Sequence, residues 1–185
     1  MSRRIGIYTG TFDPVHRGHI AFCQAALEQC ELDKIYIIPE HTPRRKRGIR
    51  SLSIRQRTLE RALEGLDRIE MATLDEPQFT VKGSLPQLKR LAGPAEPVLL
   101  VGSDVARTLG SWDDIAELVK TMSLAIGLRR HDTPGVVKKV MQLLQQQIGL
   151  TPRYTIVDAS HRFMASSYIQ GIGHVACREV VDFSI

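Results

Sequence analysis

The sequence predicts an α/β domain whose parallel sheet carries helices on both faces. Short apolar segments that suit buried strands alternate with amphipathic segments of helical period along most of the chain. The 185 residues are enough for one domain with a sizeable core and too few for two comfortable ones. We therefore expect residues 1–185 to form a single domain of this class.

The first strand and helix enclose the most informative stretch, residues 5–20, with the sequence IGIYTGTFDPVHRGHI. Its first residues are apolar and suit a buried strand, Gly10 permits a sharp turn, and an apolar stripe of helical period begins after His16. A strand, a glycine-bearing loop and a helix start collect unpaired backbone N–H groups around an anion. The stretch therefore predicts a phosphate site.

The next elements continue the alternation. Residues 34–38, KIYII, predict a buried strand. Ser53 and Gln56 have the spacing of a capping box, followed by apolar residues at helical spacing, namely Leu59, Ala62, Leu63 and Leu66. Residues 69–74 predict another strand, and we expect a helix from there toward Leu91.

The second half of the chain repeats the pattern. Three more strands are predicted at residues 97–101, 123–127 and 154–157. Ser111 and Asp114 form a capping arrangement at the start of a helix whose inner face is Ile115, Leu118 and Val119. Thr133 is expected as the N-cap of a helix with Pro134 at its first position, ending at Gly149.

The composition limits the class of protein. Hydrophobic residues make up 43% and charged residues 24% of the chain, and no apolar run approaches the ~20 residues that a membrane helix needs. Residues 1–4 lack a signal-peptide pattern, so we expect a cytoplasmic protein without a membrane partner. Cys23, Cys30 and Cys177 contain no CxxC pair, which argues against a disulfide framework or a zinc site. We expect the first two to be packing residues.

The net charge of +5 indicates an anionic partner. The densest basic cluster begins at residues 44–47, and no aromatic residue is interleaved with it, as base stacking on a nucleic acid would require. Small phosphorylated ligands are therefore expected, and no nucleic acid. A solvated charged loop is the alternative interpretation of this cluster.

His16 and His19 lie three residues apart at the predicted helix start and so share one side of that helix. They could bind a metal, although the pair has no nearby carboxylate or cysteine partner. They could be surface or capping residues, or they could donate hydrogen bonds to phosphate oxygens. The third interpretation fits the preceding loop best.

The stretch from Gly10 to His19, GTFDPVHRGH, resembles the signature of the nucleotidyltransferase superfamily with an HxGH motif. Within that superfamily the chain is most similar to bacterial nicotinate mononucleotide adenylyltransferases. The resemblance implies a Rossmann-like fold and the transfer of an adenylyl group from ATP to nicotinate mononucleotide, with release of pyrophosphate, in NAD biosynthesis. It also implies Mg²⁺ accompanying ATP, with no side chain assigned to the metal, and His16 and His19 as the catalytic residues.

The resemblance also assigns an ATP site. Asp104 matches the Gly-x-Asp motif that holds a ribose, with a helix cap as the alternative role. The family's second motif, Ile-Ser-Ser-Thr-x-Ile-Arg, is only partly retained near the carboxyl terminus, where Gln170 replaces the arginine and cannot supply its charged fork. The implied ATP-binding residues are Thr9, Gly10, Thr11, Phe12, Gly18, Gly102, Asp104, Ser166 and Ser167.

Three residues are implied in binding the acceptor. In the basic loop only a proline and the basic character of the family pattern remain, with Lys46 or Arg45 in place of the family's lysine. Thr80 matches a residue that holds the nicotinate carboxylate, with a helix N-cap as its competing role. Trp112 matches a tryptophan that stacks on the pyridine ring. Arg57 matches a family arginine or is a surface residue.

Two other functions stay open at this point. The same chemistry could act on nicotinamide mononucleotide or phosphopantetheine, because the acceptor motifs depart from the family pattern at Lys82 and Gly83. The chain could instead be a nucleotide-binding regulator or inactive paralogue, as Ala165 and Gln170 suggest. The sequence leaves a homo-oligomer open.

Overall fold

The fold is described from a computed structural model that covers residues 3–43, 48–129 and 132–159. In this part of the chain one sheet has the strand order β3-β2-β1-β4-β5-β6, and every neighbouring pair is parallel. The strands are β1 (Arg4–Gly10), β2 (Lys34–Pro39), β3 (Ile69–Met71), β4 (Glu96–Gly102), β5 (Ser123–Gly127) and β6 (Tyr154–Val157). The predicted α/β class is confirmed.

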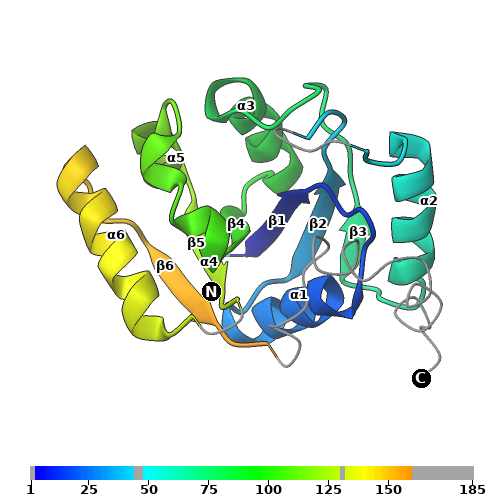
Figure 1. Cartoon of the computed structure of the whole chain (residues 1–185), viewed down its shortest axis with the longest axis horizontal. Helices are drawn as coiled ribbons and strands as arrows, with labels where there is room; N and C mark the ends of the chain where they lie inside the picture. The colour runs from blue at the N-terminus through cyan, green and yellow to red at the C-terminus, as the bar shows by residue number, and fades with distance from the viewer. Residues whose placement is uncertain (1–2, 44–47, 130–131, 160–185) are drawn as a thin grey trace.

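Helices cover both faces of the sheet, as Figure 1 shows. One face carries α1 (Arg17–Gln29) and α2 (Leu52–Leu63), and the other carries α3 (Val81–Ala92), α5 (Ile115–Thr121) and α6 (Pro134–Ile148). The short helix α4 (Ser103–Ala106) and the 3₁₀ helix η1 (Leu109–Ser111) connect β4 to α5.

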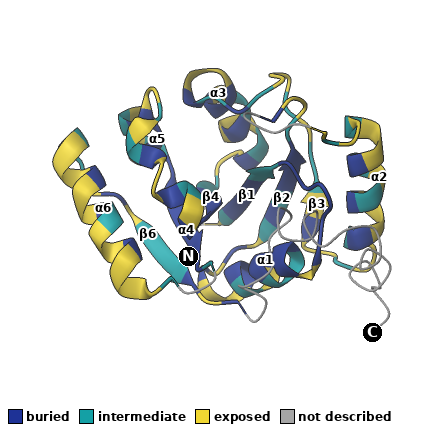
Figure 2. Ribbon diagram, in the orientation of Figure 1, coloured by how far each residue is buried: buried dark blue, intermediate teal, exposed yellow. Residues whose placement is uncertain are grey.

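Alternate residues of the central strands build two separate cores. Leu99 and Leu124 pack in the cluster that contains α3, α5 and α6. Their neighbours Leu100 and Ala125 pack in the cluster that contains α1 and α2. Because successive side chains of a strand point to opposite faces, the central strands serve both cores. Figure 2 shows these strands mostly buried and β6 at intermediate exposure, while the outer sides of the helices are exposed.

Most predicted boundaries agree with the structure. The strands at 123–127 and 154–157 have the predicted bounds. Thr133 is the N-cap of α6, Pro134 opens the helix, and Gly149 ends it in a left-handed conformation with φ 68°. Cys23 and Cys30 are buried, as expected of packing residues, and Cys177 lies outside the described residues.

Three local predictions are wrong. The capping box at Ser53 is absent, because α2 begins at Leu52 after the N-cap Ser51. The capping arrangement before α5 is also absent, since Ser111 closes a 3₁₀ turn and Asp114 has a left-handed backbone with φ 58° and no side-chain cap bond. The third strand ends at Met71, three residues earlier than predicted.

The order of the strands determines where a ligand can bind. The chain moves from β1 to β2 and β3 on one side and returns to β4 on the other, so the order reverses between β1 and β4. Ligands of such sheets bind outside the carboxyl ends of the strands at this switch point. Tyr8 is paired with Leu100, so the last residues of the two strands, Gly10 and Gly102, lie at the same edge.

In the described ranges, the chain contains no helix that is both long and apolar enough to cross a membrane.

Candidate functional site

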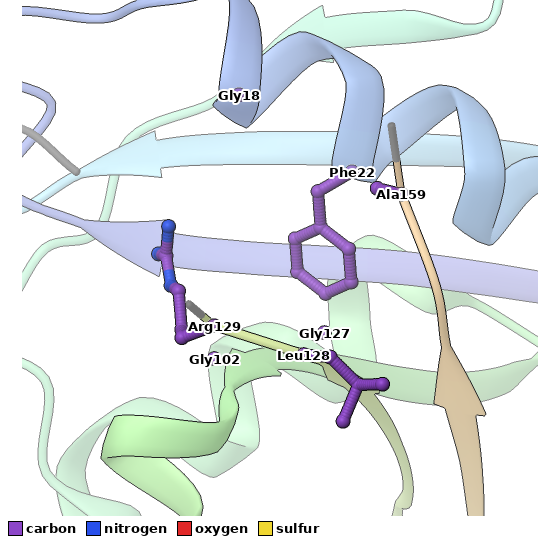
Figure 3. Close-up of a pocket in the computed structure, with 7 residues that line it drawn as sticks. All are labelled: Gly18, Phe22, Gly102, Gly127, Leu128, Arg129 and Ala159. Carbon is purple, nitrogen blue, oxygen red and sulfur yellow. The ribbon is translucent and has the colours of Figure 1, made fainter. Parts of the chain in front are cut away.

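A small hollow opens at the carboxyl edge of the sheet, between the first turn of α1 and the ends of β4 and β5. Gly18, Gly102, Arg129 and Phe22 are among the residues that line it (Figure 3). A Cβ on Gly127 would lie 2.7 Å from the Phe22 ring, so this strand end requires glycine. The absence of side chains at such positions lets α1 approach the ends of the strands closely.

The two histidines of the motif form the cap of α1. His16 is the N-cap residue, with φ −149° and ψ 168°. Its Nδ1 atom accepts a hydrogen bond of 3.1 Å from the backbone N–H of Gly18, and the Nδ1 atom of His19 accepts one of 3.2 Å from the backbone N–H of His16. In a neutral imidazole one nitrogen accepts while the other carries the proton. Both Nε2 atoms therefore carry protons when the rings are neutral.

His16 is held in that neutral form. Burial lowers the pKa of His16 from 6.5 to about 4, and the nearby positive charge of Arg129 acts in the same direction. Its Nε2 atom is buried and has no hydrogen-bond partner among the described residues. Buried polar atoms are ordinarily paired, so this N–H is a donor available to a ligand oxygen.

The rings of His16 and His19 stack, with centroids 3.8 Å apart and an interplanar angle of 26°. The His19 ring also meets the edge of Phe12 at 5.1 Å, and Phe12 meets Tyr8 at the same distance. Packing on these rings fixes the positions of both histidines. Fixed donors beside an anion site stabilise negative charge without reorganisation.

The loop residues of the predicted phosphate site have different surroundings. Thr9 and Gly10 end β1 and are half-buried, whereas Thr11 and Phe12 are buried. Phe12 has a φ of 48°, which is uncommon for a residue with a side chain and is found at functional sites. Its ring is only 2% exposed, so it supports the loop and His19 from within the core.

Arg129 is a site residue that the sequence interpretation missed. It follows β5 and extends toward the first turn of α1, near Gly18 (Figure 3). Its Nε atom lies 3.5 Å from Oδ1 of Asp104, and its positive charge acts on the buried hydroxyl of Tyr8. Its backbone N–H donates to Ser103 Oγ at 3.0 Å. The position two residues after a predicted parallel strand was the signal that could have identified it.

Asp104 lies in the first turn of α4, directly after β4. Its side chain is 62% exposed, so a carboxylate oxygen remains accessible to a ligand hydroxyl. A Cβ on Gly102 would clash with this carboxylate and would lie 2.8 Å from Arg129 Nε. Glycine at this position therefore allows the carboxylate and the guanidinium to meet over the strand end.

Two of the residues predicted to bind the acceptor, Thr80 and Trp112, lie near each other at the start of α3. Thr80 is the N-cap of α3, and its Oγ1 accepts a hydrogen bond of 3.1 Å from the Gly83 N–H, so it fills the competing cap role while its own hydroxyl proton stays available. Trp112 is half-buried, and its ring lies 5.6 Å from that of Phe79, the neighbour of Thr80. The structure thus brings Thr80 and Trp112 together through Phe79. Lys46, Ser166, Ser167 and Gln170 lie outside the described residues.

Two buried charges in or beside the loop between β1 and α1, which we call the phosphate loop after its predicted role, were also missed. Asp13 is 2% exposed and accepts a hydrogen bond of 2.9 Å from the backbone N–H of Arg50. Arg55 is 1% exposed, whereas Arg57 lies on the exposed surface of the same helix. Arg55 precedes Leu59 by four residues, and this spacing could have placed it on the inner face of the helix.

No group of three or more His, Cys, Asp or Glu side chains that could hold a metal ion occurs in residues 3–43, 48–129 and 132–159. Mg²⁺ keeps several waters and is commonly bound through substrate phosphates with few protein ligands. The N–H donors at the strand ends fit a phosphorylated ligand to which Mg²⁺ is already bound.

A parallel sheet with a glycine-lined hollow at its switch point, next to a helix start that presents the buried imidazole N–H of His16, defines a nucleotide-binding α/β protein. The chain belongs to the cytidylyltransferase-like family, whose model matches residues 7–170.

Individual relatives show which members of this family the chain is similar to. A probable nicotinate-nucleotide adenylyltransferase of Helicobacter pylori is 30% identical over 128 residues, which cover 67% of this chain and 74% of that protein. The protein of the same name from Bacillus pumilus is 32% identical over 140 residues, which cover 72% of each chain. In a third, from Dictyoglomus turgidum, the matched part covers 66% of the relative's length.

Solved structures agree with the fold. The structure of Plasmodium falciparum nicotinic acid mononucleotide adenylyltransferase complexed with NaAD has a TM-score of 0.74 at 18% identity, covering 91% of this chain and 83% of that one. The same protein complexed with APC gives a TM-score of 0.72. The resemblance and the Rossmann-like fold predicted from the sequence are confirmed.

Proposed function

We propose that this chain transfers the adenylyl group of ATP to nicotinate mononucleotide and releases pyrophosphate, a step of NAD biosynthesis. The names of its relatives and the titles of its structural neighbours support the reaction. The observation that carries the proposal is the pair of stacked histidines at the start of α1, where the buried Nε2–H of His16 has no partner among the described residues.

In the proposed reaction a phosphate oxygen of the mononucleotide attacks the α-phosphorus of ATP in line. A new P–O bond forms to the acceptor, the bond from the α-phosphorus to the bridging oxygen breaks, and its electron pair leaves with pyrophosphate. Positioning and electrostatic stabilisation are sufficient for phosphoryl chemistry of this kind, and no protein nucleophile is needed.

The described residues have distinct roles in this proposal. His16 and His19 donate hydrogen bonds from Nε2 to triphosphate oxygens, including those on which charge grows as pyrophosphate leaves. Because the pKa of His16 is lowered to about 4, it acts at pH 7 as a neutral donor and not as a proton source. Arg129 adds a positive charge beside them, and Asp104 accepts hydrogen bonds from the ribose.

The implied Mg²⁺ belongs to the substrate in this proposal. Bound to the triphosphate, it would neutralise charge on the phosphate oxygens. No described side chain is assigned to it. Excess chelator is expected to abolish turnover while thermal unfolding of the free protein stays unchanged, because the fold does not depend on the metal.

Recognition of the acceptor is assigned to Thr80 and Trp112. The hydroxyl proton of Thr80, which has no partner in the described part of the chain, suits a carboxylate oxygen, and the indole face of Trp112 suits an electron-poor pyridine. Lys46, Ser166 and Ser167 stay predictions from the sequence, as do the cytoplasmic location and a homo-oligomer.

The test is pyrophosphate release from ATP with nicotinate mononucleotide, in parallel with nicotinamide mononucleotide and phosphopantetheine. Preference for the first acceptor is expected, because a site that hydrogen-bonds one acceptor rejects analogues that leave its polar groups unpaired. Turnover with another acceptor alone would transfer the assignment to that acceptor. ATP binding by calorimetry without turnover on any acceptor would instead identify a nucleotide-binding regulator or inactive paralogue.

A further inference from the structure

The side chain of Arg55 on α2 is fully buried, at 1% exposure, and its guanidinium is bonded to backbone carbonyls. Nη1 donates to the carbonyl of Thr11 at 2.8 Å, and Nε donates to that of Arg50 at 3.1 Å. Nη2 donates to the carbonyls of Glu40 at 2.8 Å and His41 at 3.2 Å. One side chain thus holds the main chain of three separate segments.

Two of these segments border the nucleotide site. Thr11 lies in the loop between β1 and α1, five residues before His16. Glu40 and His41 directly follow β2, the neighbouring strand. The backbone N–H of Glu40 donates to the carbonyl of Gly10 at 2.8 Å, so the two loops are bonded both to each other and to Arg55.

The second loop continues this connection toward the predicted acceptor residues. The backbone N–H of Thr42 donates at 2.8 Å to the carbonyl of Pro77, which precedes Phe79 and Thr80 by two and three residues. A continuous set of hydrogen bonds therefore runs from the phosphate loop through the Arg55 side chain and the loop after β2 to the start of α3.

We propose that Arg55 is a positioning residue that holds the phosphate loop in register with the loop leading to the acceptor side of the site. This inference rests on the proposed adenylyl transfer. Arg55 acts through the backbone of both loops and makes no contact of its own with the reacting atoms. Near-attack geometry is sensitive, since a displacement of about 1 Å can cost about 100-fold in rate.

Arginine is suited to this task because of its shape. Its planar guanidinium presents five N–H donors in a rigid fork, whereas lysine presents three donors on a single atom at the end of a flexible stem. Lysine at position 55 would retain the charge and lose the geometry that spans Thr11 on one side and Glu40 on the other.

The experiment compares Arg55→Lys with Leu59→Ala, a control one turn further along α2 that is equally buried but packs in the apolar cluster beneath the helix. Both variants lose buried contacts, and only the first loses the bonds to the loops. For each folded protein we measure the dissociation constant of ATP by calorimetry and the kcat with nicotinate mononucleotide. Amide hydrogen exchange is measured at Glu40 and Thr42.

For Arg55→Lys we expect kcat to fall about 10- to 100-fold, with a smaller change in ATP affinity and faster exchange at Glu40 and Thr42. Leu59→Ala should leave kcat per folded molecule and exchange at those two amides unchanged. Arg55→Gln, which keeps part of the hydrogen bonding without the charge, should resemble Arg55→Lys.

The proposal is overturned if Arg55→Lys keeps the kcat and the exchange rates of the control, because the arginine would then contribute to stability alone. It is also overturned if both Arg55 variants fail to fold while Leu59→Ala folds. A native chain without turnover on any acceptor would refute the proposed function, and hydrogen exchange at Glu40 and Thr42 would still decide whether Arg55 positions the two loops.

Discussion

Replacing His16 by asparagine separates the two tasks of this residue. Asparagine is among the preferred N-cap residues, so its side-chain oxygen can replace Nδ1 as the acceptor for the first turn of α1. It cannot present an N–H at the position of the buried Nε2 atom. We therefore expect His16→Asn to keep the fold and to lose most of the turnover.

The size of each effect follows from the structure. Removing one preorganised donor from an anionic transition state costs about 2.7–4 kcal/mol, or about 10²- to 10³-fold in kcat. The free energy of unfolding should fall by only about 1–2 kcal/mol, because the cap is retained and only the packing of the ring on His19 is lost.

The assay is pyrophosphate release at saturating ATP and acceptor, with urea unfolding of the same preparations. Thr133→Ala is a matched control, since Thr133 is also an N-cap residue but makes no side-chain cap bond; its turnover should be unchanged. A His16→Asn protein that turned over within about 3-fold of the native chain would refute the assignment of Nε2 as a donor to the reacting phosphates.

Four further outcomes are expected. Between pH 6.5 and pH 4 the native chain should lose roughly 3 kcal/mol more stability than His16→Asn, because its unfolded state binds the proton near 6.5 and its folded state only near 4; equal pH slopes in urea titrations would contradict this. Arg129→Gln should lower kcat/KM for ATP about 10- to 100-fold. It should also raise the pKa of His16, measured by NMR titration, because it removes a nearby positive charge. An unchanged pKa would show that Arg129 does not act on His16. Gly102→Ala should weaken ATP binding about 10-fold in calorimetry, because the new methyl group displaces Asp104 and Arg129; unaltered affinity would place the nucleotide elsewhere. Trp112→Ala should raise the KM of the acceptor about 2- to 10-fold and leave that of ATP unchanged, with partial recovery in Trp112→Phe; equal changes in both KM values would argue against stacking on the acceptor.

Apolar periodicity was sufficient to predict most of the fold. Residues 123–127 and 154–157 are strands with the expected bounds. Short apolar runs bounded by turn residues can be buried in few conformations other than a strand. Boundaries that depend on backbone conformation were not predictable. Asp114 adopts a left-handed φ of 58° before α5, and tertiary packing of the preceding 3₁₀ turn overrides the local capping preference.

The helix start that carries His16 and His19 was predictable because its geometry is local. The capping positions of His16 and His19 depend on residues at most three apart, and the sequence motif already indicates a helix start there. Arg55 and Arg129 depend on carbonyls and side chains that are distant in the sequence, such as Thr11 and Asp104. A charged residue in isolation suggests a solvated surface, so its burial becomes visible only when the partners are located in space.

The hydrogen bonds that cap α1 also determine when the two histidines adopt the tautomer that carries the proton on Nε2. Because main-chain N–H groups hold the Nδ1 atoms of His16 and His19, the location of each ring proton is decided as soon as the first helical turn forms. No neighbouring acid or base has to be recruited, and no proton has to move before nucleotide arrives. Folding of this single turn therefore fixes the proton on Nε2 of both neutral rings.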